Sequence, residues 1–239
     1  MSINEQGIED ENEGIIDDLS IQCIIGTRDV IGNSNGFWRN VFPKNCKEIL
    51  FHNSNRCSFY LLIYILQEKT KKLLSIEDLK RTLWNVYKKY IDKYRVKLED
   101  ILYKQGKKDI INSIKSNAIT LEALIMSESY YLTDLDIWIF ANEYKLPIIL
   151  FSTNPFKNMV PGVNWLLLGG LENYENNEFY FIRTPHDVDN NIPPKYNLIK
   201  PKLKLSELKG FDNMMEKAMN GIEYTENIKK FSTFIEGKI

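Results

Sequence analysis

The sequence is poor in cysteine and histidine, the residue types that most often supply thiolates, general bases and zinc ligands. It contains three cysteines, Cys23, Cys46 and Cys57, and two histidines, His52 and His186. The cysteines are odd in number and none lies close to another, which argues against a disulfide framework and against a cysteine-type zinc site. We therefore expect a reducing environment, no metal ion and no cofactor.

Long apolar runs and an excess of one charge are also missing. No apolar run reaches about 18 residues, so we expect no transmembrane helix, and the acidic N-terminus lacks the pattern of a signal peptide. The 31 basic and 32 acidic residues give a net charge of −1. This balance argues against general binding to nucleic acids or membranes, and we expect an intracellular protein.

What is present is typical of a globular protein. The chain has 239 residues, of which 44% are apolar and 26% charged, enough for one domain with appendages. We expect an acidic mobile tail over residues 1–20, a domain over 21–205 and a C-terminal helical extension over 206–239. Within the domain, residues 75–132 are expected to form a helical subdomain.

Apolar patterning predicts an α/β fold with a small central mixed sheet flanked by helices. Residues 59–67 are apolar almost all round, which predicts a buried helix. Residues 75–78 form a capping box that opens a long helix. Other helices are expected at 107–115, 120–126 and 134–144, with strands at 148–151, 165–168, 179–183 and 196–199, and a short strand is possible at 20–25.

Lysine and tyrosine alternate along the predicted helix between residues 79 and 95. Such a basic face with aromatic residues is compatible with a nucleic-acid-binding surface. It is also what a solvated face beside a buried face looks like in an ordinary amphipathic helix. We favour the second interpretation because the net charge is close to zero, and we expect no nucleic-acid partner.

The stretch from Asn53 to Leu62 places Cys57 where a polar turn enters the buried helix. The N–H groups of the first helical turn are unpaired and carry partial positive charge, which favours a thiolate over a thiol. Cys57 is therefore a candidate nucleophile. Taken alone, however, the stretch favours a small cysteine packed under the helix, because free cysteine is among the most buried residue types.

Three segments in a specific order resemble the ovarian-tumour (OTU) family of cysteine proteases, in particular the divergent OTU-like domains of large DNA viruses. Ser54-Asn55-Arg56-Cys57-Ser58-Phe59 occupies the place of the family's Asp-Gly-Asn-Cys-Leu-Phe motif. The helix and strand of residues 133–151 resemble the family's central block. Lys195-Tyr196-Asn197 stands where the family has His-Tyr-Asn. The resemblance covers about residues 45–200.

The resemblance implies an OTU-like cysteine protease fold and hydrolysis of isopeptide bonds to ubiquitin or a ubiquitin-like protein. In this family a cysteine attacks the carbonyl, an imidazole moves the proton, and a polar side chain orients the imidazole. Carried over by motif, Cys57 is the nucleophile, Asn55 and Arg56 belong to the oxyanion loop, and Asn197 is the orienting group. The family's histidine position holds Lys195.

This replacement predicts impaired catalysis, because a lysine with a pKa near 10.4 is protonated at pH 7. Of the two histidines, His186 lies nine residues before Lys195 and is the first candidate for a substitute base, while His52 is the second. The alternative function is a pseudoenzyme of the same fold, acting as a ubiquitin- or protein-binding module or as a virion component. The expected location is the host cytoplasm or the virion, if the protein is viral.

Overall fold

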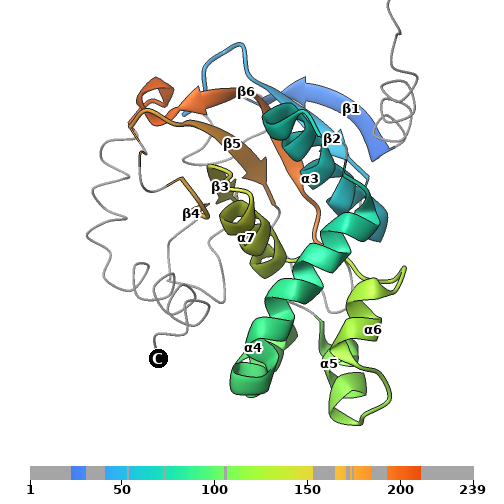
Figure 1. Cartoon of the computed structure of the whole chain (residues 1–239). Helices are drawn as coiled ribbons and strands as arrows, with labels where there is room; N and C mark the ends of the chain where they lie inside the picture. Colours follow the sequence, from blue (N-terminus) through green and yellow to red (C-terminus); the bar gives the residue numbers. More distant parts are fainter. Residues whose placement is uncertain are drawn as a thin grey trace, which may run out of the picture.

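One mixed β-sheet of six strands organises the fold (Figure 1). The computed structural model describes residues 23–30, 41–52, 54–72, 74–104, 107–152, 165–170, 173, 175–184 and 193–210. The strands are β1 (Ile24–Asp29), β2 (Lys47–Phe51), β3 (Ile148–Phe151), β4 (Trp165–Leu167), β5 (Glu178–Arg183) and β6 (Asn197–Lys204). Their order across the sheet is β1-β2-β6-β5-β3-β4. All neighbours are antiparallel except β3 and β5, which are parallel.

The four strands predicted from apolar runs are confirmed, and they share this one sheet. The other two strands differ from expectation. The possible strand at residues 20–25 lies partly outside the described residues, and β1 spans Ile24–Asp29 with an irregularity in register at Gly26. We did not predict β2, because Lys47 and Glu48 resemble a polar surface segment.

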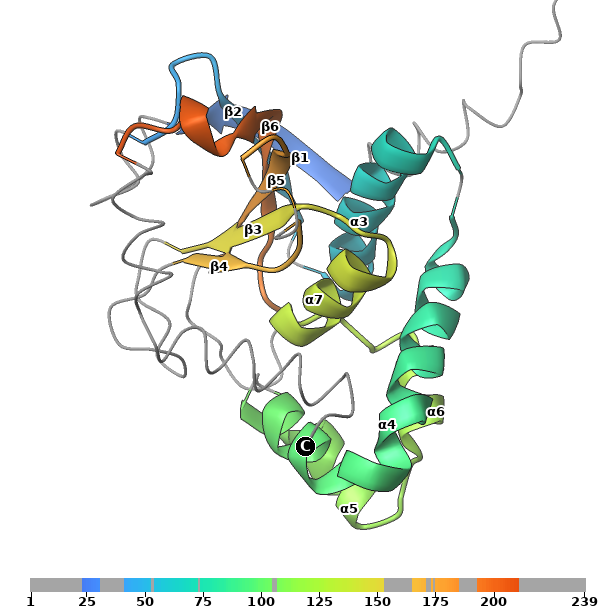
Figure 2. The same cartoon turned by 60° about the vertical axis from the view of Figure 1, so that its left-hand side comes forward.

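Five helices complete the described structure: α3 (Asn55–Thr70), α4 (Ile76–Lys104), α5 (Lys108–Lys115), α6 (Leu121–Met126) and α7 (Asp134–Glu143). A short 3-10 helix, η3 (Leu205–Glu207), follows β6. The predicted helices at 107–115, 120–126 and 134–144 are confirmed. Figures 1 and 2 show α3 and α7 beside the sheet, with α4, α5 and α6 extending away from it as a helical group.

Two helix starts carry capping boxes, and the sequence predicted the one at residues 75–78. Ser75 Oγ accepts a hydrogen bond from the Asp78 backbone N–H at 3.1 Å, and the Asp78 carboxylate accepts one from the Ser75 N–H at 3.0 Å. Thr133 and Asp136 form the equivalent box at the start of α7. These reciprocal bonds satisfy N–H groups that a helix start leaves without an intrahelical partner.

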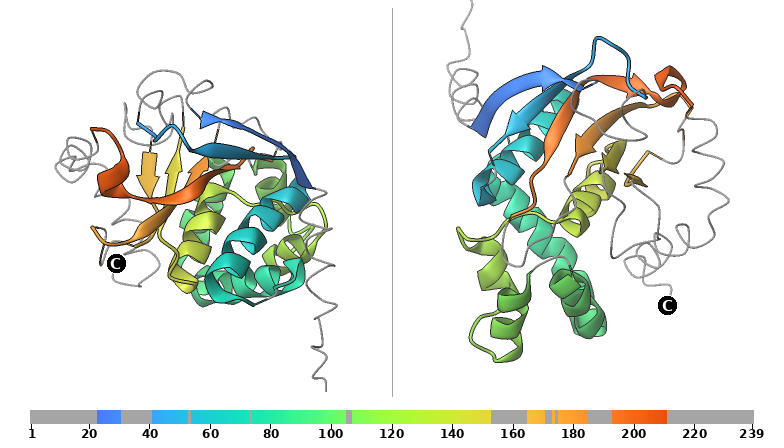
Figure 3. Two further views of the ribbon diagram at one scale, coloured as in Figure 1. Left: turned by 90° about the horizontal axis from the view of Figure 1, so that it is seen from above. Right: turned by 180° about the vertical axis from the view of Figure 1, so that it is seen from behind.

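The sheet separates two apolar cores. Because side chains alternate across a strand, successive residues of β3, β5 and β6 enter different clusters. Ile148, Leu150, Tyr180, Ile182 and Leu198 join α3 and α7 in one cluster, whereas Ile149, Phe151, Phe179, Phe181 and Ile199 join Val41, Phe42 and Cys46 in the other. Figure 3 shows α3 and α7 on one side of the sheet. We call the side of the sheet that packs against α3 and α7 the helix face, and the side that packs against Val41, Phe42 and Cys46 the opposite face.

Two glycines after β4 fit closely against the turn that leads into β3. A Cβ atom at Gly169 would overlap the carbonyl oxygen of Leu146. Gly170 has φ +84°, a left-handed conformation, and a Cβ there would lie 2.7 Å from Cβ of Pro147. Only glycine satisfies both the space and the backbone conformation at this turn.

A buried carboxylate, Asp136, connects α7 to the helical group. Its oxygens accept hydrogen bonds from Tyr87 Oη of α4 at 2.5 Å and from Tyr130 Oη at 2.9 Å. They also accept from Thr133 N and Oγ1 and from Lys107 Nζ, the last at 3.2 Å. Asp136 and Lys107 are both fully buried. Burial lowers the pKa of Lys107, and the neighbouring carboxylate opposes this shift.

Three predictions concern residues outside the described ranges. These are the acidic tail over residues 1–20, the part of the C-terminal extension beyond residue 210, and the position of His186. Within the described ranges, no helix is both long and apolar enough to cross a membrane.

Replacing Asp136 with Asn should destabilise the fold strongly. The substitution would leave the buried Lys107 ammonium without its counterion, and breaking a buried ion pair from one side typically costs about 3–5 kcal/mol. Chemical denaturation would measure this loss in the free energy of unfolding. Asp29→Asn is the matched control, because the Lys47–Asp29 pair is exposed and should be worth less than about 1 kcal/mol. Equal effects of the two substitutions would contradict this account.

Candidate functional site

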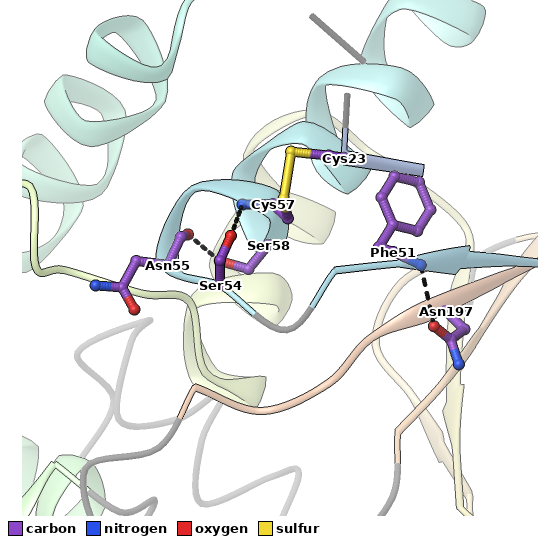
Figure 4. Close-up of a disulfide and its surroundings, with 7 residues drawn as sticks. All are labelled: Cys23, Phe51, Ser54, Asn55, Cys57, Ser58 and Asn197. Carbon is purple, nitrogen blue, oxygen red and sulfur yellow. Dashed lines mark hydrogen bonds between the residues drawn. A yellow bond between two sulfur atoms is a disulfide. The ribbon is translucent and has the colours of Figure 1, made fainter. Parts of the chain in front are cut away.

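The site begins at the connection from β2 to α3. Ser54 is the N-cap of α3 and has extended backbone angles. Its Oγ accepts a hydrogen bond from the backbone N–H of Cys57 at 3.2 Å (Figure 4). Cys57 is therefore the third helical residue, in the first turn, where the partial positive charge of the helix end is greatest. The predicted placement of Cys57 at a helix start is confirmed.

Side chains of the first turn fix this helix end to the segment before α7. Asn55 Nδ2 donates to the carbonyl oxygen of Ser129 at 2.9 Å. Ser58 Oγ donates to the Asn55 carbonyl oxygen at 2.7 Å and accepts from the Leu132 backbone N–H at 3.2 Å. The bonds to Ser129 and Leu132 join residues 74 positions apart and hold the surroundings of Cys57 in place.

Cys57 is not a free thiol in this structure. Its sulfur forms a disulfide with Cys23, the residue immediately before β1, and the two Cα atoms are 5.4 Å apart (Figure 4). The expectation that the cysteines would be unpaired is therefore wrong for this pair. Cys46 is the free cysteine among the described residues, and burial raises the pKa of its thiol to about 11.

The two residues assigned to an oxyanion loop lie inside the helix. Asn55 and Arg56 are the first two residues of α3, so they do not form a loop before it. N–H groups at these positions have no intrahelical partner, and they are suited to stabilise an anion near Cys57. The Arg56 side chain is exposed and lies over the Tyr60 ring at 5.8 Å from its centroid.

The three residues considered as a base, or standing at the position of the family's base, differ in exposure and in whether the structure describes them. His52 is exposed. Its backbone N–H donates to the Cys23 carbonyl oxygen at 2.8 Å, which places its backbone beside the disulfide. Lys195 is partly buried in the segment that leads into β6. His186 belongs to residues 185–192, which the structure does not describe.

Asn197, the candidate orienting group, has its carboxamide bonded within the sheet. Its Oδ1 accepts from the Phe51 backbone N–H at 3.3 Å, and its Nδ2 donates to Glu48 Oε1 at 2.9 Å. Asn197 and Glu48 are almost fully buried. Glu48 also accepts from Arg28 Nε and Arg183 Nε, each at 2.6 Å.

These bonds place Asn197 on the opposite face of the sheet from Cys57. Asn197 alternates with Leu198, which lies on the helix face, and shares its side with Ile199 of the second core. Cys57 belongs to the cluster on the helix face. The structure therefore does not bring Asn197 and Cys57 together as the motif resemblance implied.

Tyr196, between Lys195 and Asn197, is held by α7. Its hydroxyl donates to Asp134 Oδ1 at 2.8 Å. Burial raises the pKa of the Asp134 carboxyl to about 6; the Tyr196 hydrogen bond lowers this pKa and the nearby Asp136 raises it. This contact fixes the segment that carries Lys195 to the same helix as the Asp136 network.

Two residues central to this site were missed by sequence reasoning. Cys23 gave no signal, because its nearness to Cys57 depends on the antiparallel pairing of β1 with β2. Glu48 looked like an exposed charge, yet it joins Asn197 and two arginines in the sheet. Within the described ranges, no group of three or more metal-binding side chains is arranged to hold a metal ion.

Removing the disulfide by Cys23→Ser should lower the free energy of unfolding under non-reducing conditions by about 2–4 kcal/mol. The physical reason is that the 34-residue separation constrains the unfolded chain while the bond is intact. Denaturation with and without a phosphine reductant would measure the effect. In the reductant the two proteins should have similar stability, and a persistent difference there would contradict the disulfide as its cause.

Asp134→Asn should change the pH dependence of stability. The folded-state pKa of about 6 lies above the ordinary value of 3.8, so the wild type should lose up to about 2–3 kcal/mol as pH rises from 4 to 7. The variant lacks this ionisation, and its stability relative to wild type should rise over the same interval. Denaturation midpoints at several pH values would test this. A relative stability of the variant that stays constant between pH 4 and 7 would contradict the raised pKa of Asp134 as the cause.

Comparison of the chain with protein-family models, curated proteins and solved structures finds no match. The described residues form a mixed α/β fold, with one mixed sheet and with α3 and α7 packed on one of its faces. The candidate site is a helix-start cysteine in a disulfide, with the expected orienting residue on the other side of the sheet.

Proposed function

We propose that the chain is an OTU-like domain of the cysteine-protease type that binds ubiquitin or a ubiquitin-like protein without efficient turnover. Ubiquitin is suggested by the motif resemblance around Cys57, residues 133–151 and residues 195–197. In its reduced form the domain would present Cys57 as a nucleophile. It would lack the rest of the apparatus needed for repeated hydrolysis.

The observation that carries this proposal is the position of Asn197. Both polar groups of its carboxamide are used, one by the Phe51 backbone and one by Glu48. To orient an imidazole beside Cys57, Asn197 would have to leave a buried network and cross to the helix face. Leaving the buried Glu48 carboxylate without this donor is unfavourable, so Asn197 serves the sheet and not a proton relay.

Proton transfer is the second missing function. A positioned general base typically contributes about 10²–10⁴-fold to the rate. Lys195 occupies the family's histidine position, and an ordinary lysine is protonated at neutral pH and cannot accept a proton. Its positive charge would still favour a thiolate at Cys57 if the two groups approach. A reactive thiol with slow turnover follows from this combination.

A second candidate function is a binding module in which Cys57 has no chemical role. The Cys23–Cys57 disulfide favours this alternative, because a sulfur held in a disulfide cannot attack a carbonyl. In this case the cysteine would fasten β1 to α3. The two candidates differ in one property: whether the reduced protein reacts at Cys57 with an electrophile carried by ubiquitin.

The test is to compare covalent labelling with turnover in the reduced protein. A ubiquitin-derived electrophilic probe should label Cys57, and labelling should disappear in Cys57→Ser. Cleavage of ubiquitin chains should stay near background. Lys195→His should raise cleavage by less than about 100-fold, the lower end of what a well-positioned base supplies. The reason is that the Asn197 carboxamide is bonded to Phe51 and Glu48 and does not orient the new imidazole.

Matched variants separate the possible explanations. Asn197→Ala should lower thermal stability and leave probe labelling of the folded protein unchanged. Strong cleavage by the unaltered protein that is lost in His186→Ala, or in His52→Ala, would overturn the proposal and identify the base. Absence of labelling after verified reduction would favour the purely binding module.

A further inference from the structure

The disulfide joins two elements that remain adjacent without it. Cys23 precedes β1, and β1 pairs with β2 from Ile24 opposite Phe51. The His52 N–H also donates to the Cys23 carbonyl oxygen at 2.8 Å, and β2 leads directly into α3. Backbone hydrogen bonds therefore hold Cys23 and Cys57 near each other whether or not the sulfurs are bonded. A cysteine pair held in this way can open and close repeatedly.

The two sulfurs are chemically unequal. Cys57 lies in the first turn of α3, where unpaired N–H groups and the helix dipole stabilise a thiolate. Cys23 immediately precedes β1, and no described helix begins there to stabilise a thiolate in the same way. In thiol–disulfide exchange the sulfur that forms the more stable thiolate leaves faster. Attack is therefore directed to Cys23, with Cys57 as the leaving group (Figure 4).

Solvent access to the two bonded cysteines is restricted but present. Cys23 and Cys57 are 6% and 5% exposed, whereas Cys46 is 0% exposed. Among the described strands, β1 lies at the edge of the sheet and pairs with β2. Edge elements open locally more readily than central ones, so exchange should proceed in the folded protein at a rate set by opening at this edge.

We propose that Cys23–Cys57 is a thiol–disulfide exchange site whose co-reactant is a dithiol. A thiolate of the dithiol attacks the Cys23 sulfur, the Cys23–Cys57 bond breaks, and Cys57 leaves as a thiolate. The second thiol of the co-reactant then attacks its own sulfur in the mixed disulfide, and Cys23 leaves and takes up a proton. The dithiol is oxidised by two electrons to a disulfide, and the protein is reduced by two electrons.

The exchange rests on the disulfide and the helix start alone. Its consequence for ubiquitin rests on the function proposed above, since only the reduced protein offers the Cys57 thiolate. Oxidation would close the site and a dithiol would open it. The pair would thus decide when Cys57 is available to a bound partner.

The direction of attack can be tested with a monothiol, which stops at the mixed disulfide. The folded oxidised protein is treated with glutathione, pulsed with iodoacetamide and analysed by peptide mass spectrometry. We expect glutathione on Cys23 and the alkyl group on Cys57, in excess of the reverse pattern by roughly tenfold. Cys46, whose thiol is buried with a pKa raised to about 11, should stay unmodified and reports that the fold is intact.

The opposite pattern, with glutathione on Cys57 and the alkyl group on Cys23, would overturn the assignment. So would a disulfide that reacts only after the protein is unfolded in denaturant. A second arm uses dithiothreitol, which should give both cysteines as free thiols, with Cys57 alkylating faster than Cys23. Single variants provide the control: the Cys57 thiol in Cys23→Ser should react faster at neutral pH than the Cys23 thiol in Cys57→Ser.

The ubiquitin probe separates the two proposals. Labelling that requires prior treatment with dithiothreitol would support both. Verified exchange without any labelling would remove the ubiquitin-directed function and leave the exchange site standing. Labelling after full reduction in a protein whose native disulfide resists glutathione would remove the exchange site and leave the function standing.

Discussion

The buried carboxylate of Asp136 is the constraint on which the arrangement of the helices depends. It accepts bonds from α4, from the start of α7 and from the tyrosine segment before it, and it compensates the buried ammonium of Lys107. Such a group is unfavourable in an apolar interior unless every oxygen is satisfied. The observed placement of the helical group against α7 provides all these donors. The same helix holds Tyr196 through Asp134, so the segment that carries Lys195 is attached to the helix that carries this network.

Glu48 has the corresponding role within the sheet. One carboxylate on β2 binds Arg28 of β1, Asn197 of β6 and Arg183 of β5, so a single side chain fixes the relative positions of four strands. This explains why the end of the Lys-Tyr-Asn motif belongs to the interior. A residue that matches a catalytic motif in the sequence can have a structural role instead. Its hydrogen-bond partners show which of the two roles it has.

The sequence predicted most of what depends on local pattern. Apolar runs located β3, β4, β5 and β6, and a capping box located the start of α4. The pairing of distant segments was not predictable: Lys47 and Glu48 concealed β2, and Cys23 became the partner of Cys57 only through the register of β1 on β2. Asn197 was assigned by motif alone. The alternation of Tyr196 and Leu198 with Asn197 and Ile199 divides them between two faces, but only the structure shows which of these faces carries Cys57.

The glycine pair after β4 has a consequence for recognising distant relatives. A side chain at Gly169 or Gly170 would collide with the Leu146-Pro147 turn, so substitution there requires the strand entrance to be rebuilt. Chains that diverge elsewhere while keeping this fold should retain two glycines after the strand that corresponds to β4, against the turn that precedes β3. The glycine pair is a search pattern based on steric exclusion, and it needs no overall similarity to this chain.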